Sequence, residues 1–179
     1  MNDRPLLGEP LAMDLLNTRW AAAGERFDLF DVPGGLARWL ADNGLSARHP
    51  ADADALPPLR HVRDVLTGLV EDPASPAATA DLNRVLAHGR VRRVLDGGAP
   101  GAVVEFDDPA WGPAWAAADG YLDLLRAPDR IRRCGHPDCV LYFFDTSKNG
   151  TRRWCSMAGC GNRAKAARHQ ARSRSDLRA

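Results

Sequence analysis

The placement of the cysteines constrains this chain more than any other feature. All four, Cys134, Cys139, Cys155 and Cys160, lie in one C-terminal stretch of a 179-residue sequence. They form two pairs, each with four residues between its members, and 15 residues separate the pairs. Two short loops that each present two sulfurs are typical of a tetrahedral zinc site. We therefore predict one structural zinc ion per chain, held by these four thiolates.

Four sulfur ligands leave zinc no open coordination position, so the predicted ion cannot activate a water molecule. A segment of about 50 residues is too small to be held together by burial alone. Zinc ligation contributes roughly 10 to 16 kcal/mol of apparent binding free energy to folding in such segments. An iron–sulfur cluster or a redox pair is the alternative use of the same cysteines.

The electrical charge divides the chain into two opposite parts. Residues 1–125 carry 11 arginines and no lysine against 19 acidic residues, a net charge of −8, whereas residues 126–179 carry 13 basic and 4 acidic residues, a net charge of +9. A compact basic end favours contact with polyanions, and an acidic remainder limits non-specific association. The alternative is that the two parts simply attract each other.

Neither a membrane span nor a secretory signal is evident. No stretch approaches the roughly 20 consecutive apolar residues of a transmembrane helix, and residues 1–5 lack the basic and apolar regions of a signal peptide. We expect a cytoplasmic protein without membrane association. A reducing compartment of that kind also disfavours structural disulfides, which supports the metal site.

The segment around the cysteines predicts a β-hairpin followed by a helix. Residues 140–145 are rich in β-branched and aromatic side chains, Asn149-Gly150 is a turn signal, and residues 151–154 supply the return strand. Residues 163–172 favour a helix. A narrow stripe of small side chains at helical spacing, which would pack on the metal core, is formed by Cys160, Ala164, Ala167 and Ala171.

Basic and polar side chains of this segment are the predicted nucleic-acid contacts. Part of the positive charge can instead offset the net charge of about −2 on a zinc ion with four thiolates; the arginines available for this are Arg132, Arg133, Arg152, Arg153 and Arg163. The predicted contact residues are Arg152, Arg153, Asn162, Arg163, Lys165, Arg168, His169 and Arg172.

The N-terminal part predicts amphipathic helices and a small sheet. Apolar residues recur at helical steps in three segments and close the domain in a fourth; these are residues 33–43, 57–71, 77–88 and 115–126. Strands at 91–95 and 102–106 flank a glycine-rich loop. The fold class is therefore α+β, with one domain over residues 1–127 and a second over 128–179. Pro128 marks a joint too short for a free linker, so we expect the domains to touch.

Four polar residues near the N-terminus are candidates for binding a small-molecule effector. Asp14, Asn17, Thr18 and Arg19 lie among leucines, an arrangement that suits a ligand pocket. The alternative is that the Asn-Thr pair satisfies backbone groups or caps a helix.

Several motifs resemble a known pair of domains. Residues 134–139 (CGHPDC), 144–150 (FDTSKNG), 152–157 (RRWCSM) and 160–165 (CGNRAK) are similar to the CGNR-type zinc finger, and residues 7–19 (LGEPLAMDLLNTR) resemble the opening of the ABATE domain that precedes it. The resemblance implies a bacterial, stress-linked transcription regulator. It also implies a treble-clef finger that contacts DNA, with all four cysteines as metal ligands.

Three classes of function remain in competition. A DNA-binding regulator is favoured by the basic finger and the acidic partner domain. A module that binds RNA or another protein is the main alternative, because arginine binds phosphate without distinguishing the nucleic acid. An enzyme is not expected, since the sequence contains no nucleophile elbow, phosphate-binding loop or metalloprotease helix. No feature of the sequence indicates the oligomeric state.

Overall fold

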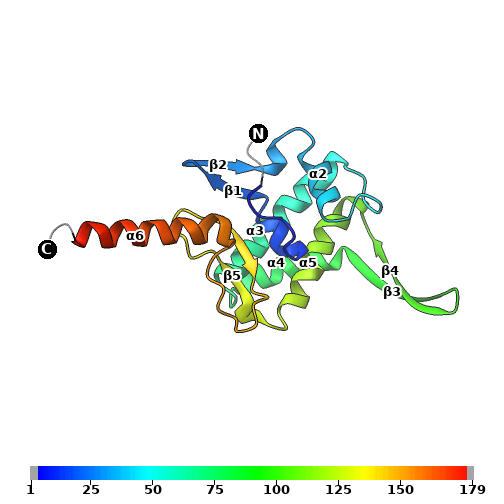
Figure 1. Ribbon diagram of the computed structural model, residues 1–179. Helices are drawn as coiled ribbons and strands as arrows, with labels where there is room; N and C mark the ends of the chain where they lie inside the picture. Colours follow the sequence, from blue (N-terminus) through cyan, green and yellow to red (C-terminus); the bar gives the residue numbers. More distant parts are fainter. Residues whose placement is uncertain (1–3, 177–179) are drawn as a thin grey trace.

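The computed structural model describes residues 4–176, with side chains as far as residue 170, and its fold is α+β (Figure 1). The helices are α1 (Leu11–Leu16), α2 (Gly35–Asp42), α3 (Leu56–Glu71), α4 (Pro76–Ala87), α5 (Gly112–Leu124) and α6 (Asn162–Asp176). The strands are β1 (Arg19–Ala22), β2 (Glu25–Asp28), β3 (Gly89–Asp96), β4 (Ala99–Phe106), β5 (Ile131–Arg133) and β6 (Tyr142–Phe144). They form three separate antiparallel pairs, β1–β2, β3–β4 and β5–β6.

Helix α3 is the centre of the N-terminal part. Its apolar residues recur at steps of three and four, and Leu59, Val62, Leu66 and Leu69 are buried against α1, α4 and α5. The four helices predicted from apolar periodicity therefore exist, with ends shifted by a few residues. Within residues 4–176, no helix is both long and apolar enough to cross a bilayer.

Two hairpins complete this part. In β3–β4 the turn is only Gly97-Gly98, both with positive φ (52° and 83°), so the strands are longer than the predicted 91–95 and 102–106. This pair extends away from the body (Figure 1). Helix α1 and the hairpin β1–β2 were not predicted, and the turn of that hairpin is Ala23-Gly24, again with positive φ at both residues.

The C-terminal segment shares the core of the N-terminal part. Leu141, Tyr142 and Phe143 are buried, and together with the four cysteines they belong to the hydrophobic cluster that contains the buried residues of α1, α3 and α5. The aromatic run of β6 therefore packs inward onto α1, which precedes it by more than 120 residues in the chain. The predicted contact between the two parts is confirmed.

The predicted hairpin between residues 140–145 and 151–154 is wrong. Strand β6 forms within the first of these segments, but it pairs with β5, in the register Arg132 opposite Phe143. The expected return strand is absent because side chains take its place: the backbone N–H of Arg152 donates to the carboxylate of Asp145 (2.9 Å), and the free edge of β6 faces the N-terminal part.

Candidate functional site

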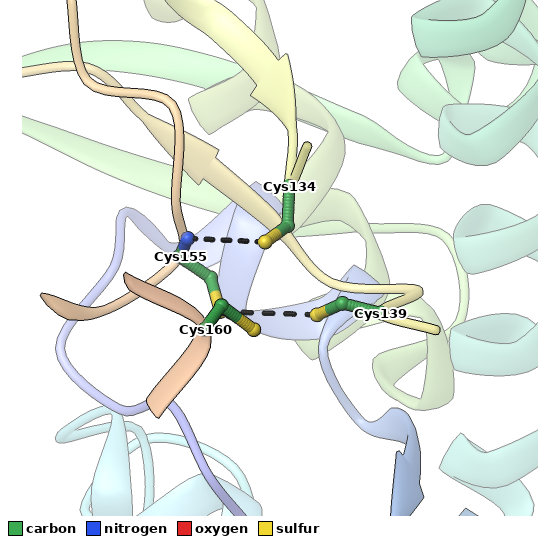
Figure 2. Close-up of side chains that lie close together, drawn as sticks. All are labelled: Cys134, Cys139, Cys155 and Cys160. Atoms are coloured by element: carbon green, nitrogen blue, oxygen red, sulfur yellow. Dashed lines mark hydrogen bonds between the residues drawn. The ribbon is translucent and has the colours of Figure 1, made fainter. Parts of the chain in front are cut away.

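The four cysteines converge on one point, as Figure 2 shows. All four are buried, and their sulfur atoms lie within 4.8 Å of one another. The sulfurs of Cys139 and Cys155 are 3.8 Å apart, and those of Cys155 and Cys160 are 3.5 Å apart. Zinc–sulfur bonds of about 2.3 Å at tetrahedral angles require sulfurs about 3.8 Å apart. The donor set therefore fits one structural zinc ion, as predicted.

Local backbone geometry brings the two cysteine pairs together. Cys134 directly follows β5, and Cys139 ends the short loop that leads back to β6. Cys155 lies just before a single π-helical turn, Met157–Gly161, which contains Cys160 and from which α6 continues. The backbone N–H of Cys155 donates to the sulfur of Cys134 (3.3 Å), and that of Gly135 donates to the carbonyl of Arg153 (2.9 Å). These bonds join the two loops independently of the metal.

The thiols of the cluster differ in how readily they lose a proton. Hydrogen bonding from the neighbouring Cys155 thiol lowers the pKa of Cys139 to about 5, and the same contact raises the pKa of Cys155. The guanidinium of Arg163 donates to the sulfur of Cys160 (2.9 Å), and this bond raises the pKa of Arg163. Arg163, predicted as a nucleic-acid contact, therefore serves the sulfur cluster.

Helix α6 leaves the metal centre and extends away from the rest of the molecule (Figure 1). The predicted stripe of small residues packs only at its beginning, because Cys160 is buried and Ala164 half-buried, whereas Ala167 is exposed. Ala171 and Arg172 lie beyond the residues whose side chains are described. Helix α6 therefore packs against the metal centre only at its N-terminal end, and the rest of the helix extends away from it.

The other predicted contact residues lie on this exposed helix or at its base. Arg153, Asn162, Lys165, Arg168 and His169 are all exposed. The guanidinium of Arg153 stacks on the ring of Trp154 at 5.3 Å, and that of Arg168 donates to the carbonyl of Ala164 (3.3 Å). The structure thus places these residues on α6 or at its base, in the part of the molecule that extends away from the body.

Arg152 is different from that group. Its guanidinium lies 4.2 Å from the ring centre of Phe143 and donates to Glu9 (2.9 Å) and to the backbone carbonyls of Trp154 and Cys155. These bonds join the second cysteine pair to the N-terminal part. Arg152 therefore has a structural position, with its guanidinium already bonded to Glu9 and to backbone carbonyls.

The four candidate effector residues do not share any of the cavities described for residues 4–176. Asp14 is buried and binds both guanidinium nitrogens of Arg4 (2.9 and 3.2 Å). Thr18 donates to the carbonyl of Leu15 (2.6 Å) and accepts from Arg63 (2.7 Å). Among the predicted four, Arg19 is the one that lines a described cavity.

Asn17 connects the two parts of the chain. Its amide nitrogen donates to the carbonyl of Tyr142 and its amide oxygen accepts from the N–H of the same residue, both at 2.8 Å. These are the two bonds that a neighbouring strand would make with β6. Asn17 therefore satisfies backbone groups, which was the alternative interpretation of the Asn-Thr pair.

Two glutamates contribute to the same junction and were not predicted. The carboxylate of Glu9 accepts from the N–H of Phe144 (2.9 Å) besides its ion pair with Arg152. Glu71 accepts from the hydroxyl of Tyr142 (3.1 Å). The sequence offered one signal, since Glu9 is the single carboxylate in the apolar opening of residues 5–13.

Fold and site together define a zinc-finger protein in which a four-cysteine centre is docked on an α+β domain. Two family models match the chain in this order: ABATE, described as "Putative stress-induced transcription regulator", over residues 9–128, and the CGNR zinc finger over residues 130–173. Because the first covers more than half of the sequence, the chain belongs to the ABATE family. A comparison with curated proteins gave no match.

Proposed function

We propose that this protein is a DNA-binding transcription regulator of the cytoplasm and that α6 is its DNA-contacting element. The observation that carries the proposal is a basic helix that projects from the metal centre with its described side chains beyond the first turn exposed. The family description supports the regulatory role. The finger keeps the cysteine loops and closing helix of a treble clef, which is the type we assign to it.

The dimensions of α6 suit the major groove of DNA. An α-helix with its side chains is about 10 to 12 Å wide, and the major groove is about 12 Å wide. Apart from its alanines the helix is polar, and a helix of this length gains little stability from propensity alone in water. A polyanion that pairs with its basic side chains would stabilise it. This accounts for a helix that makes few contacts with the body.

The proposed contacts are Arg153 at the base of the helix and the row Asn162, Lys165, Arg168, His169 and Arg172 along it. If Lys165, Arg168 and Arg172 each neutralise one phosphate, the logarithm of the binding constant should fall with the logarithm of salt concentration with a slope of about −2.7, at about −0.9 per contact.

Fluorescence anisotropy with a labelled DNA duplex at several salt concentrations tests this. The double variant Arg168→Ala/Arg172→Ala should reduce the slope to about −0.9. The matched control is Arg90→Ala/Arg93→Ala, which removes two exposed arginines from β3 and should leave the slope unchanged. Equal slopes for wild type and the α6 variant would contradict the proposal.

The alternative function is binding of RNA or another protein through the same helix. A genome-wide map of sites bound in cells that contain the protein separates the possibilities. Sharp enrichment at promoters is expected. The alternative would be favoured if no genomic site is enriched and if RNA or a protein co-purifies in a way that depends on Arg168 and Arg172.

A further inference from the structure

A cavity of about 490 Å³ lies where the N-terminal part meets the finger. Most of its lining residues come from three elements: hairpin β1–β2, helix α3 and the segment that contains β6. Their contributions are Trp20 and Phe27, Arg63 and Thr67, and Val140 and Tyr142, respectively. Pockets for small molecules commonly have volumes of about 300 to 1,000 Å³ and occur at domain interfaces.

One wall is aromatic, with Trp20 largely buried (5% exposed) and Phe27 half-buried beside it. The rings of Trp20 and Phe27, cross-strand neighbours in the hairpin, are stacked with centres 5.5 Å apart and planes within 17°. Leu16 and Val140 add aliphatic surface beside them. A planar apolar body of one or two rings would be complementary to this wall.

Most charged side chains around the cavity are paired with one another, which leaves one guanidinium available to bind a ligand. Arg63, only 1% exposed, binds both oxygens of Asp28 (2.8 and 2.6 Å), and Arg19 binds the same carboxylate (3.2 Å). Asp31 is paired with Arg60 (2.7 Å). Arg26 lines the cavity, and its guanidinium makes no hydrogen bond or ion pair with any residue of the described chain.

We propose that this cavity binds a small planar aromatic carboxylate, with its ring against the Trp20–Phe27 pair, chiefly on the half-buried Phe27, and its carboxylate on the guanidinium of Arg26. A singly charged group fits better than a phosphate, because Asp28 and Asp31 in the walls repel additional negative charge. Since Tyr142 belongs both to this wall and to the bonds with Asn17, a bound ligand contacts both sides of the junction. Its role as an effector rests on the proposed regulatory function; its binding does not.

Isothermal titration of the zinc-loaded full chain with three probes tests the proposal. 2-Naphthoate should bind saturably, 2-naphthamide should bind at least about tenfold more weakly because it lacks the charge, and butyrate should not bind measurably. Arg26→Ala should weaken 2-naphthoate binding at least about tenfold. Thr67→Trp, which fills the cavity, should abolish it.

Arg90→Ala is the matched control, because it removes an exposed arginine far along the chain from the cavity walls, and it should leave binding unchanged. Absence of 2-naphthoate binding, equal binding of the amide, or wild-type affinity in Arg26→Ala would each overturn the proposal. No nucleic acid is present in this titration. Failure of the salt-slope experiment on α6 would therefore contradict the proposed function and leave this result intact.

Discussion

Replacement of Asn17 by alanine tests how the finger is held on the N-terminal part. In the structure this one side chain satisfies both backbone groups of Tyr142, each at 2.8 Å, on the edge of β6 that has no neighbouring strand. Asn17 is 1% exposed, and Tyr142 is also buried. Alanine removes the donor and the acceptor together and leaves two buried backbone groups without partners.

The magnitude follows from the cost of such groups. Leaving a buried donor or acceptor unsatisfied costs about 1 to 3 kcal/mol, and water that enters the small space left by the amide recovers part of it. We expect Asn17→Ala to lower the free energy of unfolding by about 2 to 4 kcal/mol. Asn17→Asp should be no better, since it keeps an acceptor for the N–H of Tyr142 but places an oxygen against the carbonyl.

Urea unfolding gives the change in stability, and hydrogen exchange of the Tyr142 and Phe144 amides locates it. Asn83→Ala, at an exposed position of α4, is the matched control and should change stability by less than about 0.5 kcal/mol. Both variants should retain one zinc per chain because neither residue is one of the four predicted ligands. If Asn17→Ala unfolds like Asn83→Ala and the Tyr142 amide exchanges as in wild type, the side-chain link is not what holds β6.

Two further predictions concern the metal and the buried ion pair. Cys155→Ser should lose zinc, as measured by elemental analysis, and should increase hydrogen exchange throughout residues 134–160; a zinc-free variant with wild-type protection there would contradict a structural role. Burial alone would raise the pKa of Asp28, but hydrogen bonds from Arg63 and the N–H of Phe30 lower it overall. Asp28→Asn should therefore lower the free energy of unfolding by about 3 kcal/mol at neutral pH. This difference from wild type should persist above pH 4 and shrink as the pH falls below that value. Unfolding measured at a series of acidic pH values tests it.

The helices and the metal ligands were predictable because each depends on a pattern within a short stretch of sequence. Apolar spacing defines α2, α3, α4 and α5, and the spacing of Cys134, Cys139, Cys155 and Cys160 defines the metal centre. The hairpin β1–β2 was not predictable in this way. Its turn places Ala23 at φ 52°, where asparagine, aspartate or glycine is the usual signal.

The partner of β6 depends on tertiary structure that local sequence does not contain. Residues 151–154 have suitable composition for a return strand, but the edge of β6 at Tyr142 and Phe144 is satisfied by Asn17 and Glu9. Those side chains lie more than 120 residues earlier in the chain. A pattern of alternating residues cannot reveal that a side chain will replace a strand.

The charge asymmetry between the two parts admits two mechanisms, and Glu9→Gln separates them. If the acidic part competes with phosphate for arginines of the finger, then releasing Arg152 from Glu9 should tighten DNA binding and make the salt slope steeper by about 0.9. The structure favours the other mechanism, in which the N-terminal part positions α6.

Arg152 also contacts the ring of Phe143 and backbone carbonyls, and we expect these contacts to hold it in place when Glu9 is neutral. Lys165 and Arg168 are exposed in the docked arrangement. We therefore expect Glu9→Gln to leave the slope unchanged and the affinity no higher than in wild type, measured by the same anisotropy titration. A steeper slope with tighter binding would show that the acidic part masks the finger. With an unchanged slope, the attraction between the two parts contributes to docking instead: the carboxylate of Glu9 orients the base from which the basic helix extends.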